Sequence, residues 1–292
     1  MVHGWSGPIE AEAITSNATG LWNTGGTWVG GVVPGLSDDV IIANGHTVTI
    51  SAAPANPTIN SLSIQTGTSG TSLTFSGAYT LSVTNAVTIE PRTGNNTGQI
   101  IVGSGALNAG SVTINGSATS GRNSQITVNT GTVSTGNLTF GTGTLACTQV
   151  FTFIGAGTLN ISGNFTGNTG TFTALTSTVN FTGTGPQTVG ALTGGITYNN
   201  LTFSNGGANA KTLGANTIVT GSLTINSGAS LATNNLQLTL RGNFVNNGGT
   251  FTAGTSTATF NGTGAQSISG SNTWYGLAIT GSTARTVSFE SG

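Results

Sequence analysis

The chain has 292 residues, of which only five are Lys or Arg and six are Asp or Glu, and its formal net charge is −1. Five basic residues cannot form the cationic surface that nucleic-acid binding requires, so we expect no nucleic-acid partner. No run of 18 apolar residues is present, and no membrane-spanning helix is predicted. Val, Ile, Leu and Phe recur too regularly for a disordered chain.

The distribution of titratable groups argues against an enzyme. General acid–base catalysis needs such groups close together, yet no Asp, Glu or His occurs between Arg92 and Glu290. The calcium-binding β-roll needs a recurring Asp, and no Asp occurs after Asp39. The single cysteine, Cys147, cannot form an internal disulfide and is predicted to be a small buried residue. We therefore expect a non-catalytic protein that holds no metal and no cofactor.

Residues 1–21 are predicted to form an N-terminal arm. Their opening, MVHGWSGPIEAEA, has neither a basic segment nor an apolar segment of the kind found in a secretory signal. The final residues, RTVSFESG, stop partway through a pattern seen earlier in the chain. We expect either that a signal has been removed or that the chain is part of something longer, and the second interpretation is favoured.

Residues 22–57 are predicted to form an N-terminal cap and the first coil. Trp22 and Trp28 lie in a Gly-rich segment and are expected to cover the open end of an apolar core, which would otherwise meet water.

The same segment holds Asp38, Asp39 and His46, the only clustered ionisable residues beyond the arm. They could form a metal or sugar site. The structural interpretation is favoured, because Pro34-Gly35 predicts a turn, an Asp after a turn commonly accepts hydrogen bonds from backbone N–H groups, and His46 follows Gly45 at a strand turn.

Residues 58–292 consist of short runs with period-2 alternation of apolar and polar residues, each bounded by Gly, Asn or Ser. This pattern predicts strands separated by turns. Such runs lie at 61–64, 73–75, 81–83, 86–89, 99–102, 111–114, 125–128, 137–140, 159–161, 178–181, 200–203, 222–225, 236–240 and 258–260.

A long repeat divides the C-terminal half into units at about 163–241 and 242–292. The phrase GNF at 163–165 recurs at 242–244, 79 residues later, and TFT at 171–173 recurs at 250–252 with the same offset. The offset then falls to 76 and 74, as expected when turns shorten while strands are kept. Repetition of this kind is typical of solenoid proteins.

The repeated strand phrases favour an all-β fold, a right-handed parallel β-helix with an N-terminal cap; tandem β-sandwich modules are the alternative. Similar phrases such as SVTI at 111–114 and NLTF at 137–140 are expected to occupy the same position in successive coils and to stack like residues over like. With roughly 20–25 residues per coil there would be about ten coils, and a body about 50 Å long at ~4.8 Å per stacked strand.

Two sets of residues carry a family resemblance. The segment WNTGGTWVGGVVPGLSDDVIIANGHTVTI at 22–50 is similar to the start of the G8-type domain. The phrases at 163–190 and 242–270 resemble the strand repeats of filamentous-haemagglutinin-like or autotransporter-like bacterial surface proteins. The resemblance implies export, display on the cell surface and adhesive or structural roles.

Two ligand-binding alternatives remain open. Tyr198, Trp274 and Tyr275 lie in the repeated phrase and could form an exposed platform for sugar rings, as in a carbohydrate-binding module, although semi-buried packing is favoured for them. Thr-x-Thr pairs, such as those at 171–173 and 250–252, could line a flat face that binds ice, although the slipping repeat offset argues against one continuous rank.

The leading functional expectation is an extracellular structural or adhesive protein, either a β-solenoid stalk segment or a self-assembling surface filament subunit. Thr286, Val287 and Phe289 would form an unpaired edge at the C-terminal end. This edge could pair head-to-tail with another copy of the chain, or continue into the rest of a longer surface protein. Glycans are a further possible partner.

Overall fold

The computed structural model describes residues 13–51, 56–91, 96–116, 123–141, 149–205, 210–281 and 286–290. Cys147, most of the predicted arm and residues 282–285 lie outside the described residues. Within the described residues, 31 strands form four sheets in which every pairing of strands is parallel. The prediction of a parallel β-solenoid of about ten turns is confirmed, and the antiparallel β-sandwich alternative is wrong.

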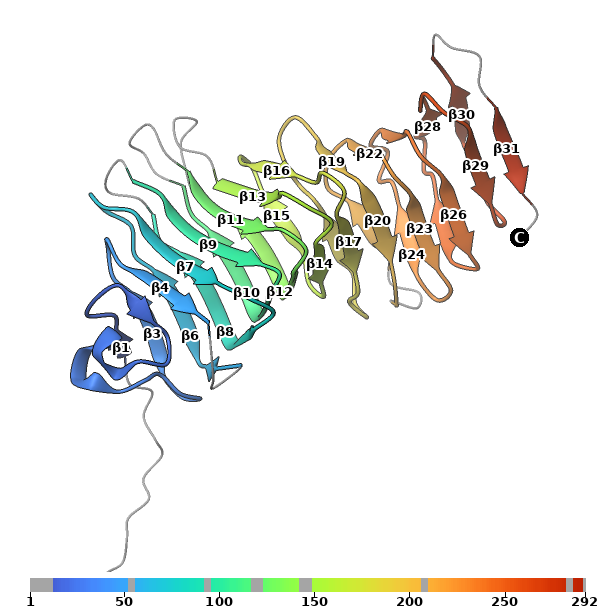
Figure 1. The fold of residues 1–292 in the computed structure, drawn as a ribbon. Coiled ribbons are helices and arrows are strands. Elements are labelled where there is room, and N and C mark those ends of the chain that lie inside the picture. The colour runs from blue at the N-terminus through green and yellow to red at the C-terminus, as the bar shows by residue number, and fades with distance from the viewer. Residues whose placement is uncertain are drawn as a thin grey trace, which may run out of the picture.

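The strands lie on three faces of an elongated body, with β1 at one end and β31 at the other (Figure 1). The first face contains β5 (Thr58–Ile59), β8 (Thr80–Ile89), β10 (Ala106–Ile114), β12 (Thr132–Phe140), β14 (Thr158–Ile161), β17 (Thr178–Phe181), β20 (Asn200–Phe203), β23 (Leu223–Asn226), β26 (Phe244–Asn247), β29 (Gln266–Ser269) and β31 (Val287–Glu290).

The second face contains β1 (Ala13–Thr15), β3 (Asp39–Ile42), β6 (Ser61–Ile64), the C-terminal halves of β8, β10 and β12, and then β15 (Phe165–Gly167), β18 (Gln187–Val189), β21 (Lys211–Leu213), β24 (Ser230–Ala232) and β27 (Thr250–Thr252). In the N-terminal half of the body, the first and second faces are therefore two arms of the same bent strands.

The third face contains β2 (Gly20–Leu21), β4 (Thr47–Ile50), β7 (Thr71–Phe75), β9 (Gly98–Gly103), β11 (Ser124–Val128), β13 (Gln149–Phe153), β16 (Thr171–Thr173), β19 (Ile196–Tyr198), β22 (Thr217–Val219), β25 (Leu238–Leu240), β28 (Thr257–Phe260) and β30 (Gly276–Ile279). Two short 3-10 turns, η1 (Gly25–Thr27) and η2 (Val29–Gly31), lie at the N-terminal end. Among the described residues, no helix has the length and apolar character needed to cross a membrane.

The core is built from inward-facing ranks, because alternate residues of each strand point into the body. On the first face, one such rank stacks residue over residue through seven pairings. It consists of Leu107, Val133, Leu159, Val179, Leu201, Leu223, Phe244 and Ile268. All of these side chains are buried. Each fully buried side chain of this kind contributes about 1.5–3 kcal/mol, so the ranks account for much of the stability of the body.

The coil shortens midway along the body. Leu107, Val133 and Leu159 follow one another at steps of 26 residues, whereas Leu201, Leu223 and Phe244 follow at steps of 22 and 21. The change occurs where β12 (Thr132–Phe140) is succeeded by two separate strands, β14 and β15.

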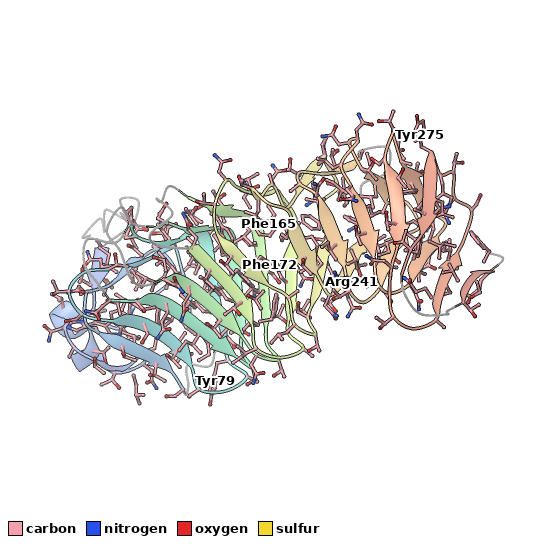
Figure 2. The ribbon with its side chains drawn as sticks, turned by 90° about the horizontal axis from the view of Figure 1, so that it is seen from above. Tyr79, Phe165, Phe172, Arg241 and Tyr275 are labelled. Carbon is pink, nitrogen blue, oxygen red and sulfur yellow. The ribbon has the colours of Figure 1, made fainter. Side chains whose placement is uncertain are left out.

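Aromatic rings fill the core at this change of cross-section. Phe172 contacts Phe151, Phe165 and Tyr198 at ring-centroid distances of 5.8, 5.5 and 5.5 Å. Phe165 and Phe172 lie near the middle of the body (Figure 2). Large rings suit this position because they bury much apolar area and tolerate tilted contacts.

The expectation that similar phrases share one place in the coil holds for some phrases and fails for others. Ser111–Ile114 and Asn137–Phe140 do pair directly, but on the second face, whereas Asn200–Phe203 lies on the first. Phe165 and Phe244, equivalent in the 79-residue repeat, also differ: Phe165 pairs with Leu138 on the second face and Phe244 lies on the first. The repeat therefore does not equal a whole number of coils.

Candidate functional site

The N-terminal end of the core is closed by two tryptophans. Trp22 and Trp28 are 2% and 1% exposed, and their rings meet edge-to-face at a centroid distance of 5.0 Å. The indole N–H of Trp28 donates to the carbonyl of Trp22 at 2.7 Å. An antiparallel bridge between Ser16 and Trp28 brings this segment across the outer edge of the second face. The edge is therefore partly covered by the chain itself.

The two carboxylates of this segment face protein groups. Asp38 accepts the backbone N–H of Gly35 at 2.7 Å, which closes the turn after Pro34. Asp39 accepts hydrogen bonds from the Asn60 amide at 2.7 Å and from the Ser61 hydroxyl at 2.5 Å. Asp38 thus closes a turn within its own segment, whereas Asp39 links its strand to side chains of the next coil.

His46 forms a pair with Ser16, whose Oγ lies 2.8 Å from the histidine Nδ1. Ser16 also accepts the backbone N–H of Ala43 at 2.8 Å, so its own hydrogen is free to point at Nδ1. Ser16 is only 2% exposed. Among the described residues, no three His, Cys, Asp or Glu side chains gather as metal ligands would.

The C-terminal end of the body differs from the N-terminal end because inward-facing positions lie open. Val287 and Phe289 of β31 stack on Gln266 and Ile268, and Thr286 precedes them with its carbonyl accepting the N–H of Gln266 at 3.0 Å. Ile268 is 3% exposed, but Phe289 is 65% exposed.

The neighbouring strand of the last coil has the same character. Ile279 of β30 continues the rank of Phe260; Phe260 is fully buried, whereas Ile279 is 52% exposed. The last described coil thus presents side chains that would be core residues if a further coil lay on top of them.

Trp274 lies in the last coil, between β29 and β30. Its ring is partly buried against Phe244, Phe251 and Phe260, at centroid distances of 4.9, 4.8 and 6.0 Å. Tyr275 beside it is 69% exposed. A hollow of about 510 Å³ is lined by Trp274 and Tyr275 together with Thr273 and residues 251–254. An exposed tyrosine beside a half-buried indole is an arrangement on which a sugar ring can stack.

Tyr198 is the third residue predicted for the aromatic platform, and that expectation is wrong. Its side chain is 0% exposed and packs against Phe172 in the core. Burial raises the pKa of its hydroxyl, because the ionised form would lie in apolar surroundings. The hydroxyl makes no hydrogen bond within the described part of the chain.

Outward-facing threonines do form ranks. On the third face, Thr49 and Thr74 pair directly and Thr127, Thr152 and Thr173 follow, with Ile101 between the two groups. The second face carries another rank, formed by Ser63, Thr88, Thr113, Thr139 and Thr166. Because two faces share this feature, it follows from the preference of threonine for exposed strand positions and does not single out one ice-binding plane.

Buried polar side chains at the corners of the coils were not predicted from the sequence. Gln187 and Gln266 each accept a glycine N–H, from Gly183 and Gly262, and donate to carbonyls of an earlier coil. The signal was present in the repeated phrases GTGPQ at 183–187 and GTGAQ at 262–266. Because burying an amide without partners is costly, these glutamines stabilise the corners only through their full set of hydrogen bonds.

Comparison of the chain with protein-family models, with curated proteins and with solved structures gave no match.

Proposed function

We propose that this chain is a non-catalytic structural and adhesive protein of the cell exterior, which acts as a β-solenoid stalk segment or as the subunit of a surface filament. The observation that carries the proposal is the open C-terminal coil, in which Ile279 and Phe289 occupy core ranks yet are more than half exposed. Exposed apolar area of this kind is favourable to bury and typical of an interaction surface.

A second copy of the chain is the occupant that we propose for this surface. The N-terminal end exposes its own apolar side chains, Val29, Val32 and Leu36, at 58, 59 and 69%. The two ends differ, so a contact between them is head-to-tail, and a head-to-tail contact that does not close into a ring gives a filament. At the C-terminal end, the open edges of β30 and β31 supply backbone donors and acceptors for pairing.

The mechanical role rests on the backbone ladders. Parallel strands are paired along the whole body, and only 4% of residues carry a charge, so like charges are not stacked over one another. The proposed extracellular location rests on the resemblance of residues 22–50, 163–190 and 242–270 to bacterial surface proteins. That resemblance also supports the alternative in which the same surface is continued by further coils of a longer stalk.

Electron microscopy of the purified chain across a micromolar concentration range tests assembly. The matched pair of variants is Phe289→Asp at the open end and Ile154→Asp, which replaces an apolar residue of similar exposure (59%) after β13. We expect filaments from the unmodified chain and from Ile154→Asp, and at least a tenfold higher concentration threshold for Phe289→Asp. Separate rods at every concentration would refute self-assembly and leave the stalk-segment form.

Carbohydrate binding is a second candidate function, favoured by the hollow beside Trp274 and Tyr275. It predicts a signal on a glycan array that is lost in Tyr275→Ala, whose side chain is exposed and outside the core. An array without signal, or one unchanged by the substitution, would remove this candidate.

A further inference from the structure

A groove follows the corner at which the first face of the body meets the second. It is lined by residues of β8, β10, β12 and β14, which succeed one another along the body, and by Ser162 and Thr182, which lie just after β14 and β17. Its volume is about 440 Å³. The groove therefore extends along the body across several coils and is not confined to one.

Two glycines line the groove at positions where successive coils approach closely. A Cβ at Gly110 would lie 2.5 Å from the carbonyl oxygen of Thr84, and a Cβ at Gly136 would lie 2.2 Å from that of Gly110. Neither distance is sterically possible for a side chain, so both positions need glycine. At the bend of β10 and β12, the backbone of these two glycines therefore lines the groove beside Val83, Ala109 and Thr135.

One wall of the groove is a rank of hydroxyl and amide side chains. Ser82, Asn108, Ser134 and Asn160 line the groove and pair in order from coil to coil. Asn180 continues the rank beyond the lining residues. Neighbouring members are about 4.8 Å apart, the spacing of paired strands.

Hydrogen bonds within the rank fix the orientation of its amides. The Asn160 amide donates to Ser134 Oγ at 3.3 Å, and the Asn180 amide donates to the side-chain oxygen of Asn160 at 2.8 Å. The exposed amide of Asn108 makes no hydrogen bond within the described part of the chain. It is available to a ligand as both donor and acceptor.

The chemistry of the lining selects the class of ligand. No Lys, Arg, Asp or Glu lines the groove, so it offers no charge-assisted hydrogen bond to a phosphate, a sulfate or a charged peptide. A peptide strand recognised through its backbone needs an open sheet edge, whereas the strands lining the groove are paired on both sides. A neutral polyhydroxylated chain needs neither a charged partner nor an open sheet edge, because its hydroxyl groups donate to and accept from amides and hydroxyls alike.

We propose that this groove binds an uncharged linear polysaccharide lying along the axis of the body. The site is distinct from the hollow at Trp274, and it adds a ligand to the structural role. Each coil contributes only a few hydrogen bonds, so affinity comes from several coils acting on one chain of sugars.

The test is calorimetric titration of the full chain with three neutral polysaccharides: hydroxyethyl cellulose, galactomannan and dextran. Ser134→Tyr places a ring in the middle of the groove. Its matched control, Thr127→Tyr, places the same ring at an outward, half-buried position of the third face. We expect binding of at least one polysaccharide, at least a tenfold weaker affinity in Ser134→Tyr and no change in Thr127→Tyr.

Asn108→Ala removes one exposed amide without adding volume, and a several-fold loss of affinity is expected even if Ser134→Tyr disturbs folding. Absence of binding to all three polysaccharides, or equal losses in Ser134→Tyr and Thr127→Tyr, would overturn the proposal. Filament formation by Ser134→Tyr is measured in parallel, so that a loss of polysaccharide binding can be distinguished from a failure of head-to-tail assembly.

Discussion

Lys211 stacks directly on Gln187, and the two side chains hold the backbone N–H and C=O groups of the same residue, Gly183. Gln187 accepts the N–H of Gly183 at 2.9 Å, and the Lys211 ammonium donates to its carbonyl at 3.0 Å and to that of Asn205 at 2.9 Å. Lys211 is fully buried. A cation thus replaces an amide at one corner of the solenoid, with carbonyl oxygens as its partners.

The burial of Lys211 predicts a pH dependence of stability. Burial lowers the pKa of its ammonium below the ordinary value of 10.5, because desolvation disfavours the charged form. Between the lowered pKa and 10.5, the unfolded chain binds more protons than the folded chain. The free energy of unfolding therefore rises with pH through that window.

Urea denaturation of the unmodified chain and of Lys211→Gln between pH 7 and pH 10 measures this effect. The substitution uses the residue that the chain itself places at position 187 and removes the titrating group. We expect the unmodified chain to gain stability relative to the variant as pH rises. If the free energies of unfolding of the two proteins changed with pH in the same way, Lys211 would not be the source of the pH dependence.

Tyr198 gives a second stability prediction. Its buried hydroxyl lacks a hydrogen-bond partner within the described residues, and an unsatisfied buried polar group costs about 1–3 kcal/mol. Tyr198→Phe should therefore stabilise the protein by about 1 kcal/mol in chemical denaturation. Tyr275→Phe, at an exposed position, should change the stability little. A loss of stability in Tyr198→Phe would mean that the hydroxyl has a partner in the folded protein.

The alternation of apolar and polar residues was sufficient to predict the strands and the parallel solenoid, because each strand has one side facing the core and one facing water. It was insufficient to predict the face on which a strand lies. All three faces of a coil impose the same local pattern, so the repeated phrases around Phe165 and Phe244 fit the second face and the first equally well.

The same ambiguity explains the error at Tyr198. An aromatic residue followed by two asparagines can look exposed in the sequence, yet the register of Tyr198 on β19 turns it inward onto Phe172. The groove at the corner was also not predictable, because it depends on the stacking of Gly110 against Thr84, which only the pairing of strands reveals.

Substitutions of Trp274 and Tyr275 should differ in their effect on stability, because the Trp274 ring packs against the core and the Tyr275 side chain is exposed. Trp274→Ala removes ring contacts to Phe244, Phe251 and Phe260, and a loss of about 2 kcal/mol is expected for a half-buried aromatic residue. Tyr275→Ala should alter stability by less than about 0.5 kcal/mol. Thermal melting of the two variants checks this, and equal losses would show that Tyr275 also supports the fold.

Two glycines provide a matched test of the close approach between coils. At Gly136 a Cβ would lie 2.2 Å from a backbone oxygen of the preceding coil, whereas at Gly185 a Cβ would meet nothing within 4 Å. Gly136→Ala must therefore push paired strands apart, and we expect a loss of about 3 kcal/mol, at the upper end of the range for overpacking. Gly185→Ala should stabilise the chain by about 0.4–1 kcal/mol, because alanine restricts the unfolded state. Chemical denaturation of both variants measures the difference. If both substitutions were tolerated equally, the coils could not be as close at the bent corner as the pairing of β10 with β12 places them.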